Sequence, residues 1–163
     1  MAKDKINHPS HYKGFKVEAW DCVRTFDFFT GNVVKYLMRA PFKGFPAEDF
    51  EKAASYVAYL NTRPDCRSCD PTSPEFPTYE LGILMDRANW SEWEDAIGEY
   101  CEDSSEITDL AFDAIFQVVS AALDGDTDHT FVTARYELAG VKAILAAKKI
   151  NAYVLGQNKI EGV

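Results

Sequence analysis

The 163-residue sequence has no apolar run that approaches the roughly 20 residues needed to span a bilayer. Three of its first five residues are charged and no apolar stretch follows them, so we expect no secretory signal peptide. Basic residues are also scarce, because 17 Lys and Arg stand against 26 Asp and Glu for a net charge of −9. That balance argues against general nucleic-acid binding, which depends on cations that neutralise phosphates. We therefore expect a soluble, cytoplasmic globular protein that does not bind membranes.

Cysteine is too sparse to indicate a disulfide framework. The chain has four cysteines and no expected route to secretion, where such frameworks form. Cys66 and Cys69 have the spacing of half a zinc site, but a second close pair is missing, so we do not expect zinc. Cys22 and Cys101 each lie alone among apolar residues and are predicted to be buried, inert thiols.

Alternating patterns typical of a sheet are nearly absent, and residues 129–133 form the only short strand candidate. Apolar residues instead recur with helical spacing over 17–26, 31–40, about 48–60, 105–123 and 132–155. Two further helices are expected to begin near Thr78 and near Ser91, where Glu94 completes the spacing of a capping box. Gly156 is expected to end the last helix. The sequence therefore predicts an all-α fold.

Proline is concentrated in one segment, which is the best candidate for a boundary. Four prolines fall between residues 64 and 77, which excludes a continuous helix or a central strand there. We expect a small helical unit over residues 1–63, a linker loop over 64–78 and a helical extension over 79–163. A unit of about 60 residues buries too little apolar surface to be very stable alone, so we expect the extension to pack with it as one bundle.

The net charge conceals an uneven distribution along the chain. Residues 1–63 carry 10 basic and 7 acidic side chains, residues 64–128 carry 2 and 17, and residues 129–163 carry 5 and 2. Anions should therefore be attracted to the N-terminal unit and repelled by the middle of the chain. If the protein binds a phosphorylated ligand, the N-terminal unit is the expected place.

Two of the three histidines lie close together in the segment 7–12, Asn-His-Pro-Ser-His-Tyr. Imidazole titrates near neutrality and can accept a proton or a phosphoryl group. Pro9 restricts the backbone between His8 and His11, so the two rings should have a defined relation. The segment is either a catalytic element or a surface loop packed by Tyr12.

A second candidate element is a polar stripe on the helix predicted over residues 31–40. Its members recur at helical spacing and are followed by Lys43; they are Asn32, Lys35, Tyr36 and Arg39. Lys35 and Arg39 lie one turn apart and should repel each other, unless an anion or an acidic side chain from another element offsets the repulsion. An ordinary solvent-exposed helix face is the alternative interpretation.

The same helix is predicted to begin at Gly31, where free N–H groups would allow a phosphate to approach closely. If the stripe faces solvent, replacing Arg39 with alanine should leave the fold intact. In an enzyme acting on phosphates, the same change should lower turnover by on the order of 100-fold, as for the loss of one charge-stabilising donor.

Residues 7–60 resemble a phage-encoded family of small proteins catalogued as a domain of unknown function. The shared pattern consists of N-H-P-x-H-Y, a Glu-Ala helix, G-N-x-x-K-Y-x-x-R-A, a Lys, and E-D-x-x-K-A-x-x-Y. Here it reads 7–12, Glu18-Ala19, 31–40, Lys43, Glu48-Asp49, Lys52-Ala53 and Tyr56. Order and spacing both hold over this third of the chain.

The resemblance implies a nucleotide-binding function in the host cytoplasm. One member of the family, from T-odd podophages, is a nucleotide kinase that works without a P-loop, and this sequence also lacks the P-loop pattern. By this resemblance Lys35 and Arg39 would stabilise phosphate charge and His11 would orient or carry the phosphoryl group. The remaining candidates would bind nucleotide; they are His8, Tyr12, Asn32, Tyr36 and Lys43. Glu18 and Asp21 would hold a magnesium ion or orient the histidines.

Two other function classes stay open. The chain could be a non-catalytic binder of nucleotides or signal nucleotides, or an inhibitor of a host protein that contacts its acidic middle region. Alternatively, Glu106-Ile-Thr-Asp109 resembles half of the carboxylate motif of all-α nucleotide pyrophosphohydrolases, which activate water with magnesium. Asp95, Glu99 and Asp113 would complete that acidic set. In each case we expect a homo-oligomer.

Overall fold

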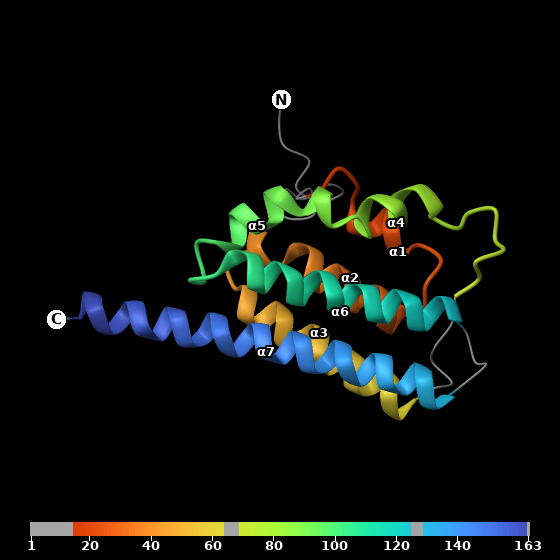
Figure 1. The fold of residues 1–163 in the computed structure, drawn as a ribbon. Coiled ribbons are helices and arrows are strands. Elements are labelled where there is room, and N and C mark those ends of the chain that lie inside the picture. The colour runs from red at the N-terminus through yellow and green to blue at the C-terminus, as the bar shows by residue number, and fades with distance from the viewer. Residues whose placement is uncertain (1–14, 64–68, 125–128, 163) are drawn as a thin grey trace.

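The computed structural model describes residues 15–63, 69–124 and 129–162, and within them the chain is an all-α bundle, as predicted. Its elements are α1 (Ala19–Val23), α2 (Phe28–Arg39), the 3₁₀ turn η2 (Ala40–Phe42), α3 (Pro46–Thr62), α4 (Thr78–Leu84), the 3₁₀ turn η4 (Arg87–Trp90), α5 (Ser91–Ile97), α6 (Ser104–Asp124) and α7 (His129–Glu161). The longer helices α2, α3, α6 and α7 lie side by side, and α1, α4 and α5 cover one side of them (Figure 1).

One apolar core joins the elements before and after the proline-rich segment. Its largest fully buried side chains come from both parts of the chain; they are Leu37, Phe50, Leu60, Leu84, Trp90, Trp93, Ile97, Ile107, Ile115, Tyr136 and Ile150. The indole of Trp93 donates a hydrogen bond of 3.0 Å to the carbonyl of Leu37 and meets Phe50 edge-on. The extension is therefore packed against the N-terminal helices, as expected.

Helix α2 begins three residues earlier than the sequence pattern predicts. Its N-cap is Asp27, whose carboxylate accepts hydrogen bonds from the backbone N–H of Thr30 at 2.8 Å and from its hydroxyl at 2.7 Å. Gly31 lies inside the helix, and its N–H donates to the carbonyl of Asp27 at 2.9 Å. The expectation that Gly31 presents free N–H groups to a phosphate is wrong, because those groups already have intrahelical or capping partners.

The Asp27 cap yields a stability prediction. We expect Asp27→Ala to lower the free energy of unfolding by about 1 kcal/mol, since the first turn of α2 loses its side-chain acceptor. Urea unfolding followed by circular dichroism measures this change. The exposed Glu92, which lies in the first turn of α5, is a suitable control site, and Glu92→Ala should change the midpoint less. An unchanged midpoint for Asp27→Ala would contradict the assignment of the cap.

Other helix ends also differ from the predictions. Helix α1 is five residues long, because Arg24 and Thr25 form a turn before α2. Ser91 provides no side-chain cap for α5; Asp86 instead caps η4 by accepting from the N–H of Ala88, and η4 continues into α5. The turn before α3 needs a glycine, since Gly44 has φ of 93°, and Pro46 then opens the helix.

Helix α7 is longer at both ends than predicted. It begins at His129, so the strand candidate over 129–133 is wrong, and it continues past Gly156 to Glu161. A glycine ends a helix only if the chain also turns there, and nothing packs against Gly156 to force a turn. Across the described residues, no helix combines the length and the apolar character that crossing a bilayer requires.

Candidate functional site

The cationic residues of α2 and α3 converge on the ring of Tyr36. The ammonium nitrogen of Lys35 lies 4.8 Å from the ring centroid, that of Lys52 lies 5.8 Å away, and the guanidinium carbon of Arg39 lies 4.5 Å away. Tyr56 of α3 stacks on Tyr36 with ring centroids 5.7 Å apart. We call these five residues the Tyr36 cluster. It gathers three positive charges around one aromatic pair in a chain whose net charge is −9.

Arg39 does not face solvent, contrary to the prediction from helical spacing. It is only 6% exposed, and its Nε and Nη2 donate to the two carboxylate oxygens of Asp49 at 2.8 and 3.0 Å. Asp49 lies in the first turn of α3 and is itself buried. The acidic partner that offsets the repulsion between Lys35 and Arg39 is therefore a side chain of the neighbouring helix. Two N–H groups of Arg39 are already occupied, which limits its use as a phosphate ligand.

Lys35 differs from Arg39 in having no carboxylate partner among the described residues. Its ammonium group donates to the side-chain oxygen of Asn32 at 2.5 Å, and Asn32 is held in turn by donating to the carbonyl of Phe28 at 2.7 Å. Partial burial lowers the pKa of Lys35 below the usual value for lysine, and the neighbouring Arg39 cation lowers it further. Lys35 is thus a half-buried cation that gains from any anion brought beside it.

The outer edge of the cluster is formed by α3. Lys52 pairs with Glu48 one turn earlier, and this contact raises the pKa of Lys52 and lowers that of Glu48. Burial and the nearby Tyr56 raise the pKa of Tyr36. Two more aromatic rings lie next to the cluster. The ring centroids of Phe28 and Phe29 are 6.2 and 6.1 Å from the centroid of Tyr56.

Of the remaining predicted site residues, Lys43 lies near enough to the cluster for its charge to act on Lys35, whereas the others belong to α1 or its N-cap or lie outside the described residues. Lys43 is exposed in the turn after η2. Glu18 precedes α1 and Asp21 lies in its first turn. The candidate residues His8, His11 and Tyr12 fall in the segment that the structure does not describe, as does Cys66.

The predicted magnesium ligands Glu18 and Asp21 form a pair of carboxylates at the start of α1. Among residues 15–63, 69–124 and 129–162 there is no group of three or more His, Cys, Asp or Glu side chains suited to a metal. Magnesium often takes only one or two carboxylates and completes its six oxygen ligands with waters and substrate phosphates, so the pair Glu18 and Asp21 stays a prediction.

The surroundings of the described thiols disfavour the thiolate form. Burial raises the pKa of Cys22 to about 12, and it raises the pKa values of Cys69 and Cys101 to about 11. Cys22 and Cys101 are buried, as predicted. The thiolate is the nucleophilic form, and none of the three has the lowered pKa typical of a reactive cysteine.

The acidic side chains of α6 are engaged in ion pairs rather than gathered around a common point. Asp109 accepts from Arg87 at 2.8 Å, Glu106 from Lys149 at 2.9 Å, and Asp113 from Lys142 at 2.5 Å. Asp95 and Glu99 of the neighbouring segment are exposed. The four-carboxylate arrangement that a pyrophosphohydrolase would need is not present among the described residues.

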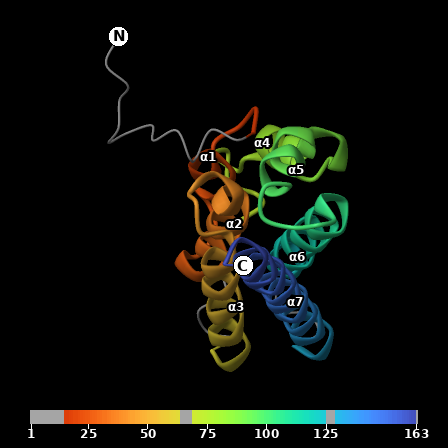
Figure 2. The same ribbon diagram turned by 90° about the vertical axis from the view of Figure 1, so that its left-hand side faces the viewer.

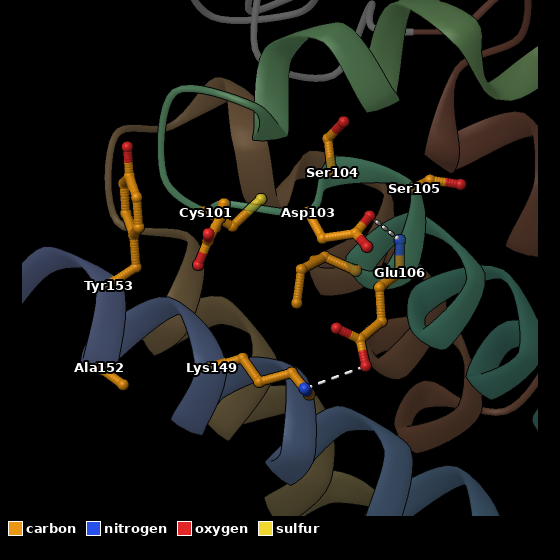
Figure 3. Close-up of a pocket in the computed structure, with 10 residues that line it drawn as sticks. Cys101, Asp103, Ser104, Ser105, Glu106, Lys149, Ala152 and Tyr153 are labelled. Carbon is orange, nitrogen blue, oxygen red and sulfur yellow. Dashed lines mark hydrogen bonds and ion pairs between the residues drawn. The ribbon is translucent and has the colours of Figure 1, made fainter.

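A pocket of about 760 Å³ lies where the N-terminus of α6 meets α7. Figure 3 shows Lys149 and Glu106 joined by their ion pair at its base, with Tyr153 on the α7 side. Asp103 accepts a hydrogen bond of 2.9 Å from the N–H of Glu106 and so caps α6. Glu102, Asp103 and Glu106 make the pocket acidic, and Lys149 is already paired. This pocket is therefore unsuited to phosphates.

Sequence reasoning missed three members of the site: Asp49, Lys52 and Tyr56. Lys52 and Tyr56 are four residues apart and share one face of α3, a spacing visible in the sequence. That this face meets the polar stripe of α2 depends on how the two helices cross, which the periodicity of either one does not determine. Asp49 lies in the first turn of α3, and its pairing with Arg39 is a tertiary contact between α3 and α2 that the pattern of neither helix reveals.

Comparison with known proteins gives one match. Residues 6–58 match a family described as a protein of unknown function, DUF3310, so a DUF3310 domain covers this part of the chain. The matched range ends within α3 and contains the whole Tyr36 cluster. No curated protein and no solved structure matches the chain.

Proposed function

We propose that the chain binds the phosphate groups of a nucleotide at the Tyr36 cluster. The observation that carries this proposal is Lys35, a half-buried ammonium group next to a buried guanidinium, which makes no ion pair with a carboxylate among the described residues and is acted on by Asp49 only from beyond contact distance. Asp49 offsets the charge of Arg39, but its two oxygens are held by the guanidinium and neither contacts the ammonium group of Lys35, so a bound anion would supply that contact. The positive N-terminal unit would also attract anions from solution.

Each side chain has a distinct part in this binding. Lys35 contacts phosphate oxygens directly, and Asn32 orients its ammonium group. Arg39 contributes positive charge without a direct phosphate contact, since Asp49 holds its guanidinium in place. Phe28 is 67% exposed beside the cluster and offers a free ring face on which a base can stack. The same surface therefore offers contacts to both the phosphate and the base of a nucleotide.

We further propose that the chain acts as a nucleoside monophosphate kinase-like phosphotransferase. This activity is supported by the resemblance of residues 7–60 to a family that contains a nucleotide kinase without a P-loop, and by the three cations gathered around Tyr36. Phosphoryl transfer depends mainly on positioning and on neutralising oxygens, and a cluster of fixed cations supplies both. In this scheme His11 orients or carries the phosphoryl group, and His8, Tyr12 and Lys43 complete the nucleotide contacts.

One assay separates the proposed activity from simple binding. The protein is incubated with nucleoside mono- and triphosphate pairs, with and without EDTA, and the products are analysed by mass spectrometry. Diphosphate formed from a monophosphate acceptor supports the phosphotransferase. Nucleotide that is bound but recovered unchanged supports a non-catalytic binder, and monophosphate with pyrophosphate would contradict both.

Lys35→Ala tests the binding site itself. We expect at least about a 10-fold weaker affinity for nucleotide, equivalent to the loss of one charged hydrogen bond of about 1.5 kcal/mol or more. Isothermal titration calorimetry measures the affinity. Because the pKa of Lys35 is lowered, the affinity of the parent protein should also begin to fall at a lower pH than for an ordinary lysine contact.

The control for Lys35→Ala is Lys16→Ala, which removes an exposed lysine outside the cluster and changes the net charge by the same amount. Its affinity should stay close to that of the parent. Equal weakening by both variants would mean that the effect is general electrostatic attraction, and the Tyr36 cluster would lose its role.

A further inference from the structure

Helix α7 has apolar side chains on two opposite faces. One face is buried in the core, through Tyr136, Ala139, Ala143, Ala146 and Ile150. The other faces solvent and carries large apolar residues at spacings of three and four; they are Leu138, Val141, Leu145 and Leu155, which are 42%, 64%, 41% and 62% exposed. Lys148 and Ala152 fill the intervening positions of the same series. A heptad-like series of this kind is typical of a helix that packs against a second helix.

The exposed face of α7 forms one wall of an apolar groove, and α3 forms the other. The groove has a volume of about 830 Å³, and α3 and α7 lie side by side along it (Figure 2). The small side chains Ala54 and Ala58 line the α3 side of the groove, whereas the larger Val141 and Ile144 line the α7 side. At Gly140 the helices are close enough that a Cβ would be in van der Waals contact with Val57, at 3.4 Å. A hollow of this shape accepts the side chains of another helix.

The C-terminal part of α7 extends past the other helices (Figure 1). Residues 151–161 are exposed except for Tyr153, which is half-buried, although they include Val154, Leu155 and Ile160. A helical segment of this length gains little stability on its own in water. Packing against a partner helix would explain both its helical state and its apolar residues.

We propose that this face binds α7 of a second copy of the chain, in an antiparallel and twofold-symmetric pair. Antiparallel pairing with Leu138 beside Leu155 of the partner subunit places Val141 beside the partner subunit's Ala152 and covers the groove. The charges favour this direction, because Glu137 then lies within about one turn of the partner subunit's Lys159.

A parallel pair would place each Lys159 beside its own copy, which is unfavourable, whereas the antiparallel pair brings it near Glu137. Lys148 lies near its own copy in both directions, directly beside it in the parallel pair and about one turn away in the antiparallel pair. In the antiparallel pair Lys148 lies beside Leu145 of the partner subunit, where its aliphatic stem covers apolar surface and its charge fixes the register at some cost in stability. The interface is isologous, so every apolar side chain on the face is used twice and the contact closes as a dimer.

The oligomeric state of the full chain tests this proposal. Light scattering after size-exclusion chromatography, over a dilution series, should give twice the mass of one chain at the higher concentrations. Val141→Glu should give a monomer with an unchanged circular dichroism spectrum, because the side chain is mostly exposed within one copy. Phe116→Glu is the matched control, since Phe116 is 40% exposed on α6, and this variant should remain a dimer. A parent protein that is monomeric at every concentration would overturn the proposal.

The direction of pairing has its own test. Glu137→Lys and Lys159→Glu should each weaken the dimer in dilution experiments, and the double reversal should restore it. A mixture of Leu138→Cys and Leu155→Cys chains should form a mixed dimer with a short bismaleimide, while each variant alone should crosslink no more than the parent. Crosslinking of each variant with itself would show a parallel pair and overturn the assignment.

Discussion

Asp49→Ala is expected to lower the free energy of unfolding by about 3–5 kcal/mol, because it leaves the guanidinium of Arg39 buried without its counter-charge. Arg39 is 6% exposed and both oxygens of Asp49 accept from it. Bulk water therefore cannot easily reach the guanidinium to replace the lost carboxylate. Urea unfolding followed by circular dichroism gives the change in midpoint. A loss of this size would leave only a marginal fold in a protein of ordinary stability.

The adjacent residue provides the control for this experiment. Glu48 also pairs with a cation, Lys52, but it is exposed, so Glu48→Ala should change stability little. The double variant Arg39→Met with Asp49→Leu replaces the pair with apolar side chains and should recover most of the stability lost by Asp49→Ala. Equal, small effects of Asp49→Ala and Glu48→Ala would contradict the description of the buried pair.

The buried pair changes how Arg39 variants are to be interpreted. The sequence pattern suggests that Arg39→Ala is a clean test of catalysis, because the residue is expected to face solvent. In the structure the same change leaves Asp49 buried and unpaired, so lost activity would follow from lost structure. Lys35→Ala is the better test of function, because Lys35 has no ion-pair partner among the described residues that the substitution would leave behind.

Helix positions followed from the sequence because each helix buries a recognisable apolar stripe. The predicted core faces of α2, α3 and α6 are buried as expected. Helix ends were less accurate, since Asp27 and Asp86 cap their elements through side-chain acceptors that are close in sequence but easily overlooked. The environment of Arg39 was missed for a different reason: helical spacing identifies the most apolar face of α2, but α3 also covers part of the polar face.

The ion pairs of the acidic middle region were also not predictable from helical spacing. The carboxylates of this region are predicted either to contact a host protein or to hold magnesium in a pyrophosphohydrolase, and spacing along α6 does not distinguish the two. In the structure Glu106 and Asp113 pair with Lys149 and Lys142 of α7, which are more than twenty-five residues away in sequence. Contacts over this separation depend on the relative placement of whole helices, which local patterns do not encode.

Trp93→Ala is the second substitution with a large expected effect, about 3–5 kcal/mol of lost stability. The indole is fully buried, packs against Phe50 and Trp90, and donates its N–H to the carbonyl of Leu37. Removing it opens a cavity at the point where α5 meets the N-terminal helices. Thermal and urea unfolding monitored by circular dichroism measure the loss without relying on tryptophan fluorescence.

Trp20→Ala is the matched control, because Trp20 is 79% exposed and its removal should have little effect. Trp93→Phe separates packing from hydrogen bonding: it keeps much of the ring but leaves the carbonyl of Leu37 without this donor, so its cost should be smaller than that of alanine. Since Leu37 lies in α2 between Lys35 and Arg39, Trp93→Phe should also weaken nucleotide binding if α5 holds α2 in position. Unchanged stability in Trp93→Ala would show that the N-terminal unit folds without support from the extension.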